Sequence, residues 1–223
     1  MDKIVKGIRH FRSDIYPGLK PRYDEMLKNG QKPHALVIGC SDSRVAFETL
    51  TGCGPGELFI VRNAGNIIPQ YGKYMGGVTA SIEFAVKALP IRDVIVCGHT
   101  HCGAMSALLK PESSSDMPAV QKWVSFARQA KRRIGKEHTH VFDRHLREAI
   151  AENVKLQVEH LRTFPCIQEK LKSGQIRLHG WVYEIENGDV VEHDEATDRW
   201  VSLTEQEEPK RDVSGRFRAT EDA

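Results

Sequence analysis

The sequence predicts an α/β fold: a central, mainly parallel β-sheet with flanking helices, an antiparallel hairpin at one edge and an N-terminal helical arm. Three short, mainly apolar runs lead to this prediction, because each has the length of one buried strand. They are residues 35–39, 57–61 and 93–97. A helical pattern of apolar residues over 78–89 lies between the last two runs. Strands that alternate with helices form parallel sheets with helices packed on their faces.

The N-terminal residues 1–34 are expected to form the helical arm of this domain. Apolar residues recur at helical spacing over residues 3–15 and make one stripe. They are Ile4, Val5, Ile8, Phe11 and Ile15. A second, short helix is expected near residues 22–29. The stripe needs a cover, which the main domain or a partner subunit could supply.

Helices and one hairpin complete the expected domain, which spans residues 35–203. The helices are expected at 103–109, 118–134 and 142–164, with a polar loop at 135–140. A strand at 176–185 turns at Asn187-Gly188 into Val190-Val191, and this dipeptide is typical of a hairpin turn. Residues 204–223 are charged and nearly free of large apolar groups, which predicts a disordered tail.

Composition excludes several classes of protein. The chain has 32 Lys and Arg against 30 Asp and Glu, and no stretch has the basic excess that nucleic acid or an anionic membrane selects. The longest apolar runs are far short of the roughly 18 residues that cross a bilayer. The first residues contain no apolar core of a signal peptide. We therefore expect a cytoplasmic protein with no nucleic-acid or membrane partner.

Cys40, His99 and Cys102 are candidates for metal ligands. Cys40 and His99 follow two of the predicted strands, and ligands bind in open α/β sheets at the carboxyl ends of strands. Two thiolates and one imidazole suit tetrahedral zinc, with the fourth position left open for catalysis. We prefer His99 to its neighbour His101, because His99 and Cys102 are three residues apart and share a face.

The other cysteines are interpreted as ordinary thiols. Five cysteines, an odd number, argue against a secreted disulfide framework. Cys97 lies within a predicted strand, and Cys53 and Cys166 have no histidine partner nearby in the sequence. No Cys-x-x-Cys motif is present, which argues against a thiol redox protein.

Asp42 and Arg44 follow Cys40 and alternate with serines. Seen alone, they predict an ordinary ion pair. Beside an open metal position, Asp42 is close enough to become the fourth ligand, and Arg44 is the cation that could hold it away.

Three motifs together closely resemble the β-class carbonic anhydrases. They are CSDSR at 40–44, RNAGN at 62–66 and GHTHCG at 98–103. The resemblance covers about residues 1–203 and is strongest to the bacterial branch with cyanate-operon and carboxysomal enzymes. It implies a lyase, a carbonate dehydratase, that uses Zn²⁺ to hydrate carbon dioxide reversibly to bicarbonate and a proton. It also implies a homodimer or homotetramer in which the N-terminal helix embraces the neighbouring subunit.

The resemblance also implies roles for individual residues. Cys40, His99 and Cys102 would be the zinc ligands, and Asp42 and Arg44 the catalytic dyad. Gln31 corresponds to a substrate-binding glutamine of the plant-like enzymes. The apolar carbon dioxide pocket corresponds to Phe59, Ala64, Phe84 and Gly103.

The sequence departs from the family pattern at one position, and two other functions are compatible with parts of it. Some bacterial members have an inhibitory bicarbonate pocket around a tryptophan, an arginine and a tyrosine. Arg62 and Tyr183 match two of these residues, but Val37 replaces the tryptophan, so we do not expect this pocket.

A hydrolase of carbonyl sulfide or carbon disulfide would use the same nucleophile and fold. A structural zinc protein that serves as an interaction module would have no use for an open metal position or for Asp42 and Arg44.

Overall fold

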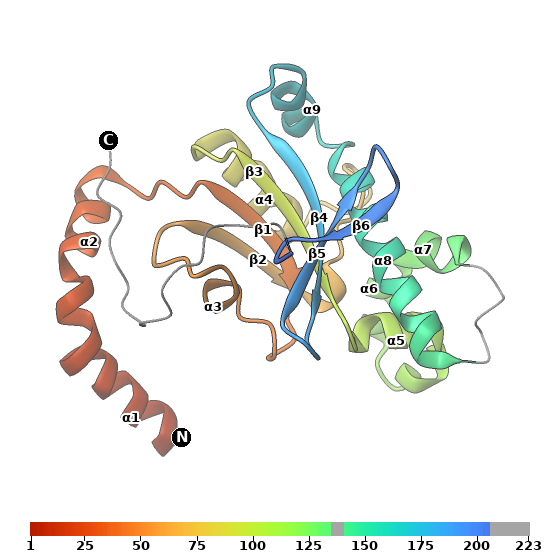
Figure 1. The fold of residues 1–223 in the computed structure, drawn as a ribbon, viewed down its shortest axis with the longest axis horizontal. Coiled ribbons are helices and arrows are strands. Elements are labelled where there is room, and N and C mark those ends of the chain that lie inside the picture. Colours follow the sequence, from red (N-terminus) through yellow and green to blue (C-terminus); the bar gives the residue numbers. More distant parts are fainter. Residues whose placement is uncertain (135–140, 206–223) are drawn as a thin grey trace.

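The computed structural model describes residues 1–134 and 141–205, and a six-stranded sheet lies at its centre (Figure 1). The strands are β1 (Ala35–Cys40), β2 (Leu58–Asn63), β3 (Asp93–His99), β4 (Arg177–Glu184), β5 (Asp189–Asp194) and β6 (Arg199–Ser202). Their order across the sheet is β2-β1-β3-β4-β5-β6. The first four strands are parallel, and β5 and β6 pair antiparallel. The predicted α/β class, parallel sheet and edge hairpin are confirmed.

The strand order reverses between β1 and β3. From β1 the chain moves outward to β2, whereas from β3 it moves in the opposite direction to β4. Such a reversal opens a crevice at the carboxyl ends of the two central strands. Cys40 is the last residue of β1 and His99 is the last residue of β3, so both lie at this crevice.

The sheet has a large core on one face and a small one on the other. Leu36 and Ile38 of β1 point into the large core, whereas Val37 points into the small one. Because β1 lies between two strands and is buried on both faces, all six of its residues are buried. This burial explains the unbroken apolar run in the sequence.

Helices pack on both faces of the sheet and also form the N-terminal arm. The α-helices are α1 (Asp2–His10), α2 (Tyr16–Asn29), α3 (Phe47–Thr51), α4 (Gly77–Ala88), α5 (Gly103–Leu109), α6 (Pro118–Val124), α7 (Arg128–Arg133), α8 (Phe142–Leu161) and α9 (Pro165–Lys172). Helix α8 packs on β3 and β4, and α4 packs on β1 and β2. On the opposite face, Phe47 of the short helix α3 closes the small core. No helix within the described ranges is both long and apolar enough to span a bilayer.

The N-terminal arm stands away from the sheet (Figure 1). Helix α1 continues through a π-helical turn at Phe11–Ile15 into α2, and no residue of these three elements is buried. The predicted helix over 3–15 is therefore confirmed. The prediction for the second helix was too short, because Pro17 lies in the first turn of α2, where a missing N–H costs nothing.

Other boundaries also differ from those predicted. The expected helix over 118–134 is divided into α6 and α7 by a 3₁₀ turn at Ser125–Ala127. The expected helix over 142–164 ends at Leu161, since Pro165 begins α9. Helices α3 and α9 and strand β6 were not predicted. The expected loop at 135–140 and most of the expected tail, residues 206–223, lie outside the described residues.

Candidate metal centre and active site

Cys40, His99 and Cys102 meet in the crevice at the carboxyl ends of β1 and β3. The ligand atoms of the three residues lie within 4.8 Å of one another, and all three residues are buried. Cys102 enters the group because it directly precedes α5, which begins immediately after the turn that follows β3. Cys40 thus joins one compact donor set with two residues that lie 59 and 62 positions further along the chain.

The ring of His99 is oriented by the backbone. Its Nδ1 donates a hydrogen bond to the carbonyl oxygen of Thr100, at 2.8 Å. That bond places the proton on Nδ1 and leaves the Nε2 lone pair free. Nε2 is buried and has no hydrogen-bond partner within the described part of the chain. A buried acceptor without a partner is costly, and a bound cation would satisfy it.

The two thiols interact strongly with each other. Hydrogen bonds from the Cys102 thiol and from the N–H of Gly65 lower the pKa of the Cys40 thiol. The hydrogen bond between the two thiols and burial raise the pKa of the Cys102 thiol. The pair therefore loses one proton easily and the second with difficulty, because two adjacent buried thiolates repel each other. A divalent cation between them removes that repulsion.

Asp42 and Arg44 form a bidentate ion pair beside the donor set. Arg44 Nε lies 2.9 Å from Asp42 Oδ1, and Nη2 lies 2.8 Å from Oδ2. The backbone N–H of Arg44 also donates to Oδ1, at 3.0 Å. The Arg44 guanidinium holds the pKa of the Asp42 carboxyl well below its usual range. Asp42 is thus an ionised, oriented carboxylate at the rim of the site.

Comparisons with known proteins agree with this geometry. The family model described as carbonic anhydrase matches residues 35–190, which include the whole donor set and the ion pair. The chain belongs to the carbonic anhydrase family. A carbonic anhydrase of Pseudomonas aeruginosa is 44% identical over 209 residues, which are 93% of this chain and 94% of that protein. A carbonic anhydrase of Synechococcus elongatus is 43% identical over 194 residues, 86% of this chain and 71% of that protein.

The likeness extends to solved structures and places the chain in the β class. The structure of the β-carbonic anhydrase CcaA superposes with a TM-score of 0.86 at 38% identity, covering 91% of this chain and 98% of that one. The Coccomyxa β-carbonic anhydrase superposes with a TM-score of 0.73 at 29% identity, covering 85% and 84%. The present carbonic anhydrase is accordingly a lyase that interconverts carbon dioxide and bicarbonate.

Arg62 of this carbonic anhydrase fixes the loop that bears the ion pair. Its Nε donates to the carbonyl oxygen of Cys40 at 2.9 Å, and its Nη2 to that of Asp42 at 2.7 Å. The sequence analysis gave Arg62 as part of a motif and as the match to the arginine of an inhibitory pocket that we did not expect, and it missed this role. Its place opposite Gly39 in the register of β1 and β2 is what brings it to the loop.

A buried row of polar side chains on α8 was also missed. Asn153 donates to the carbonyl oxygen of Gly65, and Gln157 accepts from the N–H of Ile68. The N–H of Gly65 in turn donates to Cys40 Sγ, at 3.3 Å. The polar residues of α8 thus hold the turn that contacts the first thiol. Their spacing of four residues on one face was the available signal.

The structure separates the expected substrate-binding residues into two groups. Ala64 and Gly103 adjoin the donor set, because Ala64 precedes the Gly65 that contacts Cys40, and Gly103 follows Cys102. Phe59 pairs with Leu36, four residues before Cys40, which places it about 13 Å from the ligand end of the strand.

Two further expected substrate residues lie away from the donor set. Phe84 packs against Phe59, with ring centroids 6.0 Å apart, and is half exposed. Gln31 is exposed between α2 and β1.

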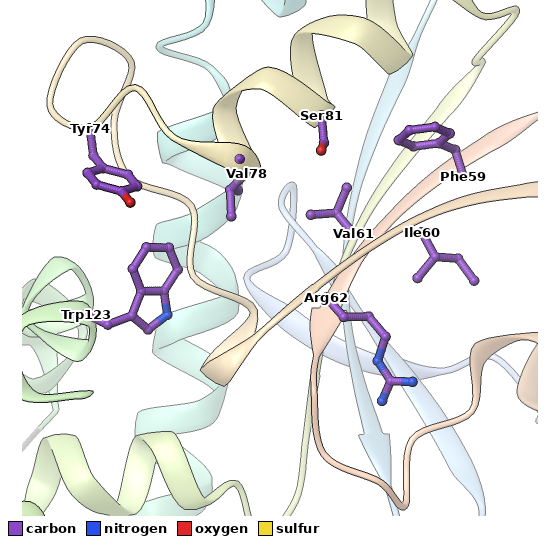
Figure 2. A pocket seen from close by; sticks show the side chains of 9 residues that line it. Phe59, Ile60, Val61, Arg62, Tyr74, Val78, Ser81 and Trp123 are labelled. Atoms are coloured by element: carbon purple, nitrogen blue, oxygen red, sulfur yellow. The ribbon is translucent and has the colours of Figure 1, made fainter. Parts of the chain in front are cut away.

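A cavity of about 430 Å³ lies along β2, at the outer edge of the sheet (Figure 2). Phe59 lines one side of it, and Tyr74 and Trp123 line the other, with their rings 6.0 Å apart. Trp123 Nε1 donates to the carbonyl oxygen of Ala64, at 2.9 Å. The cavity wall is therefore joined directly to the turn beside Cys40.

The remaining cysteines lie outside the donor set. Cys97 belongs to the small core, and burial raises the pKa of its thiol to about 12. Cys166 is buried in α9, and Cys53 is half-buried in a loop. Val37, which replaces the tryptophan of some bacterial members, is buried in the small core against which Tyr183 packs.

Proposed function

We propose that this carbonic anhydrase is a zinc enzyme whose ligands are Cys40, His99 and Cys102. The buried Nε2 of His99, which faces two thiols and has no partner among the described residues, is the observation that supports the proposal most directly. Two sulfurs and one imidazole nitrogen match the donors that zinc prefers. Zinc bound there would act as a Lewis acid and make a hydroxide nucleophile available for carbon dioxide at moderate pH.

Asp42 and Arg44 are proposed as the catalytic dyad. The carboxylate of Asp42 can accept a hydrogen bond from the attacking water and so orient a lone pair toward carbon dioxide. Arg44 holds the carboxylate in that position through two hydrogen bonds. If Asp42 left Arg44, it could become a fourth metal ligand and close the site.

The substrate pocket is proposed to combine Ala64 and Gly103 with Gln31, Phe59 and Phe84. The first two adjoin the donor set within one chain. The other three lie away from it. They can therefore contribute only if a second copy of the chain packs against the edge of the sheet at β2.

We propose that the chain assembles as a homodimer or homotetramer. The apolar stripe of the arm, residues 1–34, is exposed, as are Met75 and Phe84 near the sheet edge. One solved chain, 25% identical with a TM-score of 0.69, comes from a description of two tetrameric β-carbonic anhydrases of Sordaria macrospora. The arm, the catalytic domain at 35–203 and the tail at 204–223 are proposed as parts of one cytoplasmic enzyme.

Metal analysis and parallel assays test this proposal. The purified chain is expected to contain one zinc ion per subunit and to hydrate carbon dioxide much faster than it hydrolyses carbonyl sulfide. Faster hydrolysis of carbonyl sulfide would favour the hydrolase alternative. Stoichiometric zinc without either activity would favour the structural alternative.

A further inference from the structure

Glu186, in the turn between β4 and β5, contacts both residues that separate the second and third proposed ligands. Its Oε2 accepts a hydrogen bond from the hydroxyl of Thr100, at 2.5 Å. Its Oε1 lies 2.8 Å from Nε2 of His101. One carboxylate therefore tethers the two-residue turn 100–101 through two different side chains.

The carbonyl oxygens of the same two residues accept hydrogen bonds from side chains of the active site. The carbonyl oxygen of Thr100 accepts the hydrogen bond from His99 Nδ1 that orients the ring, at 2.8 Å. The carbonyl oxygen of His101 accepts from Nη2 of Arg44, at 3.1 Å. The direction of the metal-facing imidazole and the position of the guanidinium therefore both depend on this turn.

The backbone of the turn needs such support. His101 has φ of +56°, in the left-handed region that residues other than glycine seldom adopt. A strained conformation persists only where surrounding contacts hold it. The contact of the His101 ring with Glu186 is one such restraint.

Glu186 and the Thr100 hydroxyl that it binds are each held by one further group. Arg147 of α8 places Nη2 2.5 Å from Oε1 of Glu186 and also pairs with Glu184. The N–H of Ile185 donates to the hydroxyl of Thr100, at 3.0 Å. The hydrogen bond from Thr100, together with Arg147 and His101, lowers the pKa of Glu186 to about 2, so it is ionised at neutral pH.

We propose that Glu186 is a positioning residue of the active site, which fixes the turn 100–101 and through it the imidazole of His99 and the guanidinium of Arg44. The proposal rests on the proposed metal centre. It extends the active site to the turn between β4 and β5, whose residues belong to none of the motifs that contain the ligands. Groups that orient a ligand in this way typically contribute about 10- to 100-fold to metal affinity or activity.

The test compares full-length Glu186→Ala with Glu195→Ala. Glu195 is a suitable control, because it pairs with Arg162 at the end of α8, at 2.7 Å, without touching residues 99–102. Zinc affinity is measured by competition with a chelator, and the absorption spectrum of the cobalt-loaded protein reports the geometry of the ligands. We expect Glu186→Ala to bind zinc about tenfold more weakly and to shift the cobalt bands, and Glu195→Ala to match the wild type.

Two further variants separate positioning from a general loss of folding. Glu186→Gln keeps an acceptor for Thr100 and should recover the greater part of the zinc affinity. Thr100→Val keeps the shape of the turn but removes the tethering hydroxyl, and it should reproduce part of the cobalt shift. Wild-type zinc affinity and cobalt bands in Glu186→Ala would overturn the role of Glu186 and leave the proposed metal centre standing. A wild-type chain that bound no zinc would overturn both.

Discussion

Asp42 and His99 face each other across the proposed metal position. Oδ2 of Asp42 lies 3.9 Å from Nε2 of His99, and the same oxygen lies 2.8 Å from Nη2 of Arg44. The carboxylate is therefore close enough to enter the metal coordination, and the guanidinium is the group that opposes this movement.

Arg44→Ala and Asp42→Asn should fail in different ways. Without Arg44, the carboxylate is free to become a fourth ligand, so carbon dioxide hydration should fall most near neutral pH. Asp42→Asn should lose activity by about 100-fold while retaining zinc, because the oriented acceptor is lost but the ligands remain. Steady-state hydration rates and zinc content check both. Arg177→Ala, which breaks an exposed pair with Asp93, is the control. Wild-type activity of Arg44→Ala at pH 7.5 would contradict the closing-carboxylate account.

Substitution of the thiols should divide them into two classes. Cys40→Ser and Cys102→Ser should lose zinc and activity together, since each removes one sulfur from a three-ligand site. Cys97→Ser and Cys166→Ser should retain zinc, because both thiols lie outside the donor set. Elemental analysis of the purified variants measures the outcome. If Cys166→Ser emptied the site, the ligand assignment would be wrong.

Removal of residues 1–20 should reduce the size of the assembly. The deleted segment contains the exposed apolar stripe of α1 and the π-helical turn, which makes no buried contact within its own chain. Sedimentation velocity of the shortened and full-length chains compares their masses. An unchanged mass would show that the arm does not hold the subunits together.

The stability of the fold should fall in mild acid through His160. Burial lowers the pKa of this imidazole below its ordinary value of 6.5, and its Nδ1 lies 2.6 Å from the carbonyl oxygen of Ile68. The unfolded chain therefore binds a proton at a higher pH than the folded chain does, and stability is lost as pH falls below about 6.5. Urea denaturation at pH 7.5 and 5.5 should show a smaller difference for His160→Gln than for the wild type. His10→Gln, on the exposed arm, is the control; an equal difference in all three proteins would contradict the assignment.

The donor set could be predicted from the sequence because it follows from a rule of topology. Cys40 and His99 end two apolar runs, and the carboxyl ends of neighbouring parallel strands meet at one edge. The ion pair of Asp42 and Arg44 could be predicted because the two residues are local to one turn.

Contacts that depend on register or on distant turns could not be predicted. The distance of Phe59 from the ligands follows from its pairing with Leu36, and no local pattern reveals that register. Glu186 reaches Thr100 only because β4 lies beside β3 and its turn lies over the end of that strand. Helix α3 is only five residues long and depends on Phe47 in the small core, which no helical periodicity reveals.

Hydration of carbon dioxide by the full-length protein, with zinc removed and then restored, tests the central claim most directly. The steady-state rate is measured on the purified protein, on the same protein after chelation and dialysis, and again after addition of one equivalent of zinc. The account predicts high activity, its loss on chelation and its recovery with zinc, and no recovery in Cys40→Ser. Full activity in a protein shown by elemental analysis to be free of metal would contradict the account.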